Sequence, residues 1–279
     1  EKAMIQMTYD RMKKIVPKEK IFIVTNYNYI DKVKEQIPEI NDINIITEPC
    51  SKNTAPCILL STIYIKSIYK NANIVCVSSD SHIENENKFI DDIVLANEFV
   101  TKKQEAIVTI GIKPTRPETN YGYIKYEHSD GKVLKVSKFV EKPDLELAKK
   151  YYESKEYLWN AGMFIFNAES ILKEFENNLP KEYNLLINLP ENINSEYYKF
   201  LNENYEKCEK ISIDYAVMEK SNNVYTIPTE IGWDDIGTWN SVERYIPKDE
   251  RDNVLKGNIE AIDSNNNIVY ANNKKVVLL

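Results

Sequence analysis

The stretch Ile74-Val75-Cys76-Val77-Ser78-Ser79-Asp80 decides the fold. Four apolar residues in a row, followed by two serines and an aspartate, are typical of a buried strand that ends at a polar edge. Residues 56–69 before it and residues 89–100 after it have apolar side chains at helical spacing. A strand flanked by two helices indicates a βαβ arrangement, in which ligands bind beyond the carboxyl ends of the strands.

The same alternation continues outward from this stretch toward both sides. Helical spacing covers residues 4–16 and 29–37, and short apolar runs typical of buried strands cover residues 21–24, 43–47 and 106–112. Strands that alternate with helices predict an α/β fold with a mostly parallel mixed sheet covered on both faces.

The pattern changes after Pro114. Strands are predicted at residues 123–126, 133–140 and 163–166, and helices at residues 145–152, 168–175, within 180–221 and at 238–245. From Gly257 onward, short alternating strands at 259–262, 268–270 and 276–279 are separated by Asn-rich turns. We therefore expect a main domain over residues 1–250, and the start of a small all-β module over residues 251–279.

The composition excludes several classes of protein. The chain has 279 residues, a formal net charge of −7, only 7 glycines, 4 cysteines and 2 histidines. A dinucleotide fingerprint needs three glycines within six residues, and the sequence has no such cluster. A P-loop is also missing, because Gly232 and Gly237, the only pair at its spacing, are followed by Thr238-Trp239 rather than by lysine. The acidic balance argues against nucleic-acid binding, and no apolar run is long enough for a membrane span. The cysteine spacing predicts reduced thiols in a cytoplasmic protein and no zinc site.

Two acidic positions are candidates for a metal site. Asp80 directly follows the predicted buried strand, where a carboxylate can hold Mg²⁺ together with substrate phosphates. Its alternative role is to cap a turn. In Gly232-Trp233-Asp234-Asp235-Ile236-Gly237, one aspartate is explained as a helix N-cap. That role leaves unexplained why two glycines bracket the pair in a glycine-poor chain.

Three further segments combine glycine or a helix start with polar groups. Asn120-Tyr121-Gly122-Tyr123 and Trp159-Asn160-Ala161-Gly162 are either pocket walls or ordinary turns. Glu141-Lys142 ends a strand, and the pair is either an exposed ion pair or a site for hydroxyl and phosphate groups. In residues 48–56, Asn53 or Thr54 would cap the next helix, with free N–H groups as an alternative anion site.

Taken in order, these segments carry a resemblance that covers nearly the whole chain. Any one of them is weak, but seven in the correct order are specific; they are residues 48–56, 79–82, 114–124, 140–143, 159–164, 212–219 and 233–239. Together they resemble the mannose-1-phosphate guanylyltransferases, a family of sugar nucleotidyltransferases. The resemblance implies a Rossmann-like nucleotidyltransferase domain followed by a left-handed β-helix.

The resemblance also implies a reaction. Mannose 1-phosphate would attack the α-phosphorus of GTP, giving GDP-mannose and pyrophosphate, with Mg²⁺ as cofactor and a homodimer as a candidate assembly. The sugar phosphate is already a nucleophile at neutral pH, so catalysis would consist of in-line positioning and charge neutralisation.

Roles for individual residues follow from the same resemblance. Asp80 and Asp235 would hold Mg²⁺ and, with Lys142, form the catalytic set. Glu141, Asn160 and the backbone of Gly122 would bind mannose hydroxyl groups, and Lys142 would bind the phosphate.

The nucleotide has its own expected residues. Glu48 and the turn Asn53-Thr54-Ala55 would face the guanine, whose N1–H and N2–H₂ groups distinguish it from adenine. Arg116 and Asp214 are expected to support the residues that contact the substrates.

The sequence departs from the family pattern in two ways. Asn120 stands where glycine is commoner. The family's opening Gly-rich loop has no counterpart before Met4, which favours a fragment that lacks its first strand and this loop. The alternatives are a transferase for another hexose 1-phosphate and nucleotide pair, and a non-catalytic regulatory subunit that binds sugar nucleotides.

Overall fold

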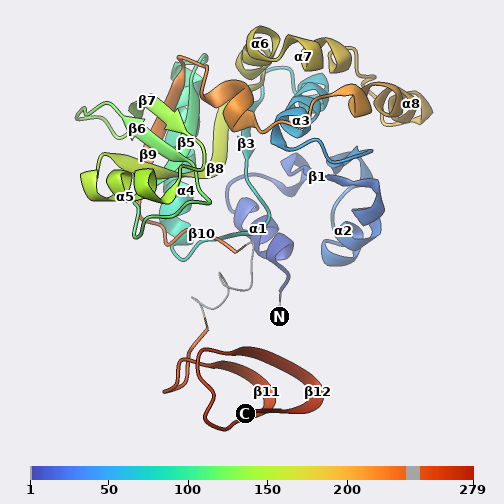
Figure 1. Cartoon of the computed structure of the whole chain (residues 1–279). Helices are drawn as coiled ribbons and strands as arrows, with labels where there is room; N and C mark the ends of the chain where they lie inside the picture. The colour runs from blue at the N-terminus through green and yellow to red at the C-terminus, as the bar shows by residue number, and fades with distance from the viewer. Residues whose placement is uncertain (1, 237–245) are drawn as a thin grey trace. The chain divides into compact units, whose positions relative to one another are not determined.

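The computed structural model describes residues 2–236 and 246–279, which fall into two compact units (Figure 1). The first unit comprises Glu1–Ser79 and Ile83–Trp233, and the second comprises Asp80–His82 and Asp234–Leu279. No helix within the described ranges is long and apolar enough to cross a membrane. The helix predicted at residues 238–245, and Gly237 before it, lie outside the described residues.

The first unit is built on a six-stranded mixed sheet with the order β3-β8-β5-β9-β7-β6. Its strands are β3 (Asn73–Cys76), β5 (Ile107–Ile112), β6 (Tyr123–Tyr126), β7 (Leu134–Val140), β8 (Tyr157–Asn167) and β9 (Val224–Thr229). A separate parallel pair is formed by β1 (Ile23–Asn26) and β2 (Ile45–Glu48). The strand expected at residues 74–77 is present as β3 at residues 73–76, and the α/β class is confirmed.

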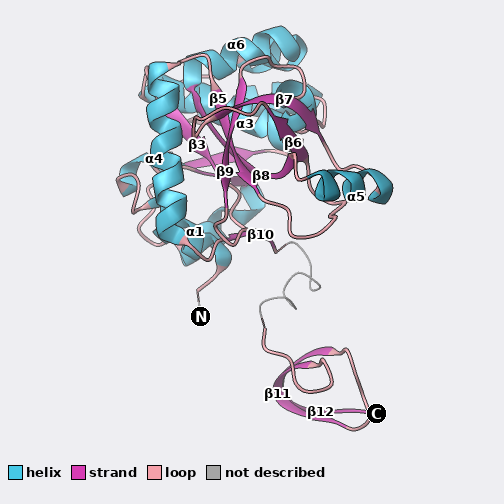
Figure 2. Cartoon of the chain, turned by 90° about the vertical axis from the view of Figure 1, so that its left-hand side faces the viewer, coloured by secondary structure: helices cyan, strands magenta, loops and turns pink. Residues whose placement is uncertain are grey.

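Helices cover both faces of the sheet (Figure 2). They are α1 (Met4–Met12), α2 (Ile30–Gln36), α3 (Thr54–Ile68), α4 (Glu86–Lys102), α5 (Leu145–Ser154), α6 (Ala168–Asn178), α7 (Pro180–Leu186) and α8 (Ser195–Asn204). Successive strand residues point to opposite faces, so Ile74 packs in the cluster with α3 and α6, whereas Val75 packs in the cluster with α4. The continuous apolar runs thus belong to strands that are buried on both sides.

The prediction of a mostly parallel sheet was wrong, because most neighbouring strands of the six-stranded sheet pair antiparallel. Within the six-stranded sheet, β5–β9 is parallel, whereas β8 runs antiparallel to β3, β5 and β6, and β7 runs antiparallel to β6 and β9. The cause is β8, which inserts between β3 and β5 in the opposite direction. It has 11 residues rather than the predicted short strand at 163–166.

The described part of the second unit contains one antiparallel and one parallel pair of strands. The two-residue strands β4 (Ser81–His82) and β10 (Asp234–Asp235) pair antiparallel. β11 (Val254–Ala261) and β12 (Ile268–Leu278) pair in parallel. The two last predicted strands, at 268–270 and 276–279, are therefore one strand, in which Asn273 takes a φ of 56° instead of forming a separating turn.

Candidate active site

Glu141 and Lys142 follow the end of β7. The Lys142 Nζ lies 3.0 Å from the Glu141 Oε1, and the Glu141 side chain is only 8% exposed. Lys142 has a φ of 45°, in the left-handed region that non-glycine residues rarely adopt. Strained backbone of this kind is concentrated at functional sites, where the surrounding structure holds it in place.

Gly122 lies directly against these residues. A Cβ atom at Gly122 would stand 2.5 Å from the Glu141 Oε2 and 3.4 Å from the Asn160 Cβ. The Gly122 carbonyl accepts a 2.8 Å hydrogen bond from the Asn160 backbone N–H. A side chain at this position would therefore displace the Glu141 carboxylate, and Gly122 lies beside both Glu141 and Asn160.

Asn160 lies within β8 and is 8% exposed. Its Oδ1 accepts hydrogen bonds from the Thr109 hydroxyl at 2.9 Å and from the Gly162 backbone N–H at 3.2 Å. Its Nδ2 donates to the Asp214 Oδ1 at 2.9 Å. An amide NH₂ group carries two N–H bonds, so the orientation fixed by these partners leaves one donor for a ligand.

Asp214 is the third acidic or amide group of this cluster. It begins a π-helical turn, Asp214–Met218, a type of irregular turn that is frequent at functional sites. Burial raises the pKa of its carboxyl group to about 6, and the charge of Glu141 acts in the same direction, while Lys142 and Asn160 oppose the shift. Two carboxyl groups and one ammonium group thus share this part of the first unit.

Replacing Asp214 by asparagine is expected to change how stability depends on pH. Because the folded-state pKa of about 6 exceeds the ordinary 3.8, the stabilisation from this proton is complete below about pH 4 and is lost as the pH rises through 6. Relative to the wild type, the free energy of unfolding of the variant should rise by about 3 kcal/mol between acid and neutral pH. Urea unfolding of both proteins across this pH range measures the difference, and a pH-independent difference would contradict the assignment.

Arg116 contacts Trp159, the residue that precedes Asn160. The guanidinium group lies 5.0 Å from the Trp159 ring centre and 5.8 Å from that of Tyr121, and it forms a 3.2 Å ion pair with Glu118. Cations over aromatic faces are attracted by the ring quadrupole. Arg116 therefore contacts Trp159, the residue before Asn160 in β8.

Glu48 is the last residue of β2. Its carboxyl group accepts a hydrogen bond from the Tyr205 hydroxyl, and its carbonyl accepts one from the Asn26 side chain at 3.2 Å. Burial raises the pKa of the Glu48 carboxyl group, and the neighbouring Tyr205 hydroxyl and Cys57 thiol lower it. Neither Tyr205 nor Cys57 was singled out from the sequence.

The turn that follows Glu48 caps α3. The Asn53 side chain accepts a 2.8 Å hydrogen bond from the Thr54 N–H, and Asn53 has a φ of 69°. The Ala55 N–H donates to the Ile211 carbonyl at 3.1 Å, and the Thr54 hydroxyl accepts from the Ile213 N–H at 2.9 Å. The capping role is thus present, and the anion alternative is wrong for the N–H groups of Thr54 and Ala55, because both already have protein acceptors.

The two predicted metal ligands lie in or next to one short strand pair of the second unit. In the β4–β10 pair, Asp235 stands opposite Ser81, the residue that follows Asp80. Asp80 and Asp235 are both exposed. Gly232, just before β10, has a φ of 63°, as expected for a glycine placed where an unusual backbone is needed.

A divalent cation suits this pair of aspartates. Carboxylate oxygens are hard donors, and Mg²⁺ is commonly bound by one or two carboxylates together with substrate phosphates. In the part of the chain that the structure describes, no group of three or more His, Cys, Asp or Glu residues is arranged to hold a metal ion. The donor set therefore fits an ion that shares its coordination with a bound substrate.

Thr109 and Tyr205 are the residues that the sequence analysis missed. Thr109 lies in the fully buried strand β5, and its only sequence signal is a polar residue within an apolar run. Tyr205 follows α8 in the turn Tyr205–Lys207 and is 0% exposed, one of 19 tyrosines in the chain. Neither signal distinguishes a site residue from an ordinary core residue.

Comparison with known sequences gives one family model and several relatives. Residues 1–252 match the model described as nucleotidyl transferase. The mannose-1-phosphate guanylyltransferase of Salmonella muenchen is 36% identical over 278 residues, and this match covers 97% of the present chain and 58% of that protein. The chain thus spans less than two thirds of the length of the curated relatives that it matches.

Solved structures give a consistent comparison. A mannose-1-phosphate geranyltransferase from Thermus thermophilus is similar with a TM-score of 0.85 and 30% identity, covering 100% of this chain and 79% of that chain. A mannose-6-phosphate isomerase from Helicobacter pylori is similar with a TM-score of 0.71 and 25% identity, covering 84% of this chain and 91% of that chain.

Proposed function

The chain belongs to the nucleotidyl transferase family, and from this premise we propose that it transfers GMP from GTP to mannose 1-phosphate, giving GDP-mannose and pyrophosphate. The observation that carries the proposal is the cluster of Glu141, Lys142 and Asn160, which combines hydroxyl-binding groups with a cation. The name of the Salmonella muenchen relative supports the choice of sugar and base.

The sugar phosphate would bind at this cluster. Glu141 and the remaining Asn160 N–H offer an acceptor and a donor to sugar hydroxyl groups, and Gly122 admits the ring close to the backbone. The Lys142 side chain is 59% exposed, so it is accessible to a phosphate. The bond with Glu141 raises the pKa of Lys142, which keeps it cationic at neutral pH.

GTP would bind at the end of β2, where ligands of open α/β sheets gather. Glu48 would accept the N1–H and N2–H₂ groups of guanine. The turn Asn53-Thr54-Ala55 would contact the base through side chains and carbonyl groups, since the N–H groups of Thr54 and Ala55 are engaged.

Nucleotidyl transferases in general use a divalent metal ion, and we propose that it is Mg²⁺, held by Asp80 and Asp235. When bound, the ion supplies charge neutralisation at the phosphates. The protein's own residues orient the reactants: Glu141 and Asn160 hold the sugar, and Lys142 holds its phosphate as the nucleophile. No side chain has to remove a proton, because the phosphate monoester is already ionised at neutral pH.

We also propose a domain organisation, a cellular compartment and an assembly for the chain. The parallel pairing of β11 with β12 supports a left-handed β-helix that begins within residues 251–279, after a transferase domain over 1–250. Four free cysteines favour a reducing, cytoplasmic compartment, and a homodimer is the proposed assembly.

Pyrophosphate release from a panel of nucleoside triphosphates and hexose 1-phosphates, at saturating Mg²⁺, tests the proposal. We expect turnover with GTP plus mannose 1-phosphate above every other pair. Preference for glucose 1-phosphate with UTP or dTTP would assign another transferase. Binding of GDP-mannose without any turnover would assign a regulatory subunit. Conversion of mannose 6-phosphate without a nucleotide would assign the isomerase activity named for the Helicobacter pylori structure.

A further inference from the structure

A fully buried phenol reaches the carboxyl group of Glu48 from 157 residues away in the chain. Tyr205 follows α8, is 0% exposed, and donates its hydroxyl hydrogen bond to the Glu48 Oε1. A carboxylate can accept about four hydrogen bonds, so the bond from Tyr205 leaves capacity for further donors.

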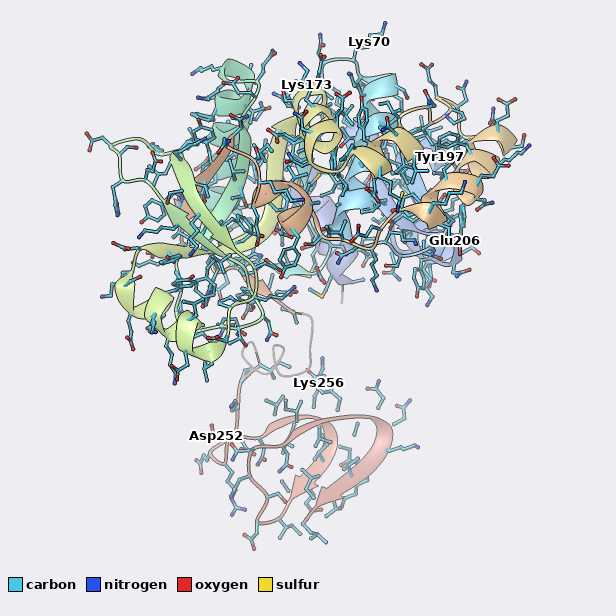
Figure 3. The ribbon with its side chains drawn as sticks, turned by 45° about the horizontal axis from the view of Figure 1, so that its top comes forward. Lys70, Lys173, Tyr197, Glu206, Asp252 and Lys256 are labelled. Atoms are coloured by element: carbon cyan, nitrogen blue, oxygen red, sulfur yellow. The ribbon has the colours of Figure 1, made fainter. Side chains whose placement is uncertain are left out.

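The segment that carries Tyr205 is fastened to the proposed nucleotide turn. The Lys52 side chain donates to the Glu206 carbonyl, and the Lys52 carbonyl accepts from the Ile211 N–H at 3.2 Å. The Ala55 N–H then donates to the Ile211 carbonyl at 3.1 Å. Figure 3 labels Glu206 on this segment. Because these bonds fix the segment along its length, the Tyr205 hydroxyl has a defined position relative to Glu48.

We propose that Tyr205 is the positioning residue for nucleobase selection: its hydroxyl holds one oxygen of Glu48, so that the carboxylate presents its remaining lone pairs to a base with two adjacent N–H donors. This inference rests on the proposed binding of GTP at the end of β2. Guanine offers N1–H and N2–H₂ side by side. Hypoxanthine lacks the second group, and adenine places an acceptor at N1, which a fixed carboxylate repels.

The energetic reason is the cost of an unfixed carboxylate. Without the Tyr205 hydroxyl, Glu48 keeps its burial but loses a donor, so it either turns toward another partner or binds a proton. A protonated carboxyl group both donates and accepts, and it can then pair with adenine as well as with guanine. Selection between bases is lost, while the phosphate and sugar contacts are unaffected.

The test is Tyr205→Phe in the full chain, which keeps the buried ring. The kcat/KM values for GTP, inosine triphosphate and ATP are measured with mannose 1-phosphate. We expect the preference for GTP over ATP to fall by about tenfold to a hundredfold, the range of a lost hydrogen bond to a charged group. A purely structural role would lower the three values by the same factor and leave the preference unchanged.

Tyr197→Phe is the matched control. Tyr197 lies in α8, is 0% exposed, and its hydroxyl has no hydrogen-bond partner among the described residues (Figure 3). Its substitution removes a buried hydroxyl group from the same helical segment, and the GTP preference should not change. In a Glu48→Gln background, Tyr205→Phe should add little to the loss of preference, because coupled residues are non-additive.

The outcomes separate this inference from the proposed function. A wild-type protein without turnover of GTP and mannose 1-phosphate overturns the proposed function. A wild type that prefers GTP and a folded Tyr205→Phe variant with the same preference overturn the inference alone. If Tyr205→Phe does not fold, the GTP preference of Glu48→Gln is measured instead. An unchanged preference would mean that the Glu48 carboxylate does not select the base, and it would overturn the inference.

Discussion

Asp235→Asn is expected to abolish pyrophosphate release while the fold stays intact. Asparagine has the size of aspartate but lacks the charge that would hold Mg²⁺. A metal ion contributes several kcal/mol of charge stabilisation, so we expect turnover to fall by about a thousandfold or more. Because Asp235 is exposed, the substitution should change the free energy of unfolding by less than about 0.5 kcal/mol. Pyrophosphate release and urea unfolding measure the two effects.

A matched control separates the metal role from a general loss of charge. Asp263→Asn removes an aspartate from the same unit, where the side chain is 90% exposed and forms a 3.3 Å ion pair with Arg251. Its turnover should equal that of the wild type. Raising the Mg²⁺ concentration should recover part of the activity of Asp235→Asn if the lost carboxylate is a ligand. Turnover of Asp235→Asn at the wild-type level would remove Asp235 from the metal site.

Local patterns predicted most element types because burial imposes a period on the apolar residues. The strand at 123–126 has the predicted bounds, and the ends of α3 and α4 differ from the predicted ones by at most three residues. Direction in the sheet has no such local signal. The antiparallel insertion of β8 depends on which strands meet in three dimensions, and a buried apolar run is the same in either direction.

The first half of β8 could not be predicted as a strand, because it contains the residues of the candidate site. Trp159-Asn160-Ala161-Gly162 combines an amide with a glycine at a φ of 65°, and such a composition is typical of a turn. The strand nevertheless continues through it, because Thr109 and Asp214 satisfy the Asn160 amide. Those partners are 51 and 54 residues away in the chain, a distance that no local window covers. Local rules fail here at a candidate functional site, as expected for such sites.

The site residues were predictable where glycine marked them. Gly122 lies against the Glu141 carboxylate, and Gly232 has a positive φ, so scarce glycines indicated both segments. Tyr205 carried no such mark. Its contact with Glu48 depends on how a helical segment folds back on the turn after β2, and it could be found only from the structure.

Lys142→Gln is expected to lower kcat/KM for mannose 1-phosphate by about a hundredfold or more, the cost of removing one group that stabilises charge at a reacting phosphate. Glutamine keeps a hydrogen-bond donor for Glu141, so the change isolates the charge. The Lys142 side chain is 59% exposed, and its ion pair with Glu141 therefore contributes little to stability. Steady-state kinetics with each substrate varied in turn measures the effect, and the KM for GTP should change little.

The division between kcat and KM then assigns the step at which the charge acts. A fall confined to kcat means that Lys142 stabilises charge in the transition state, whereas a rise confined to the KM for mannose 1-phosphate means ground-state binding of the phosphate. Lys142→Arg should retain part of the activity, because it keeps the charge. Lys138→Gln is the matched control, since Lys138 is an exposed residue of β7 four positions earlier. Equal kcat/KM values for Lys142→Gln and Lys138→Gln would exclude a phosphate-binding role for Lys142.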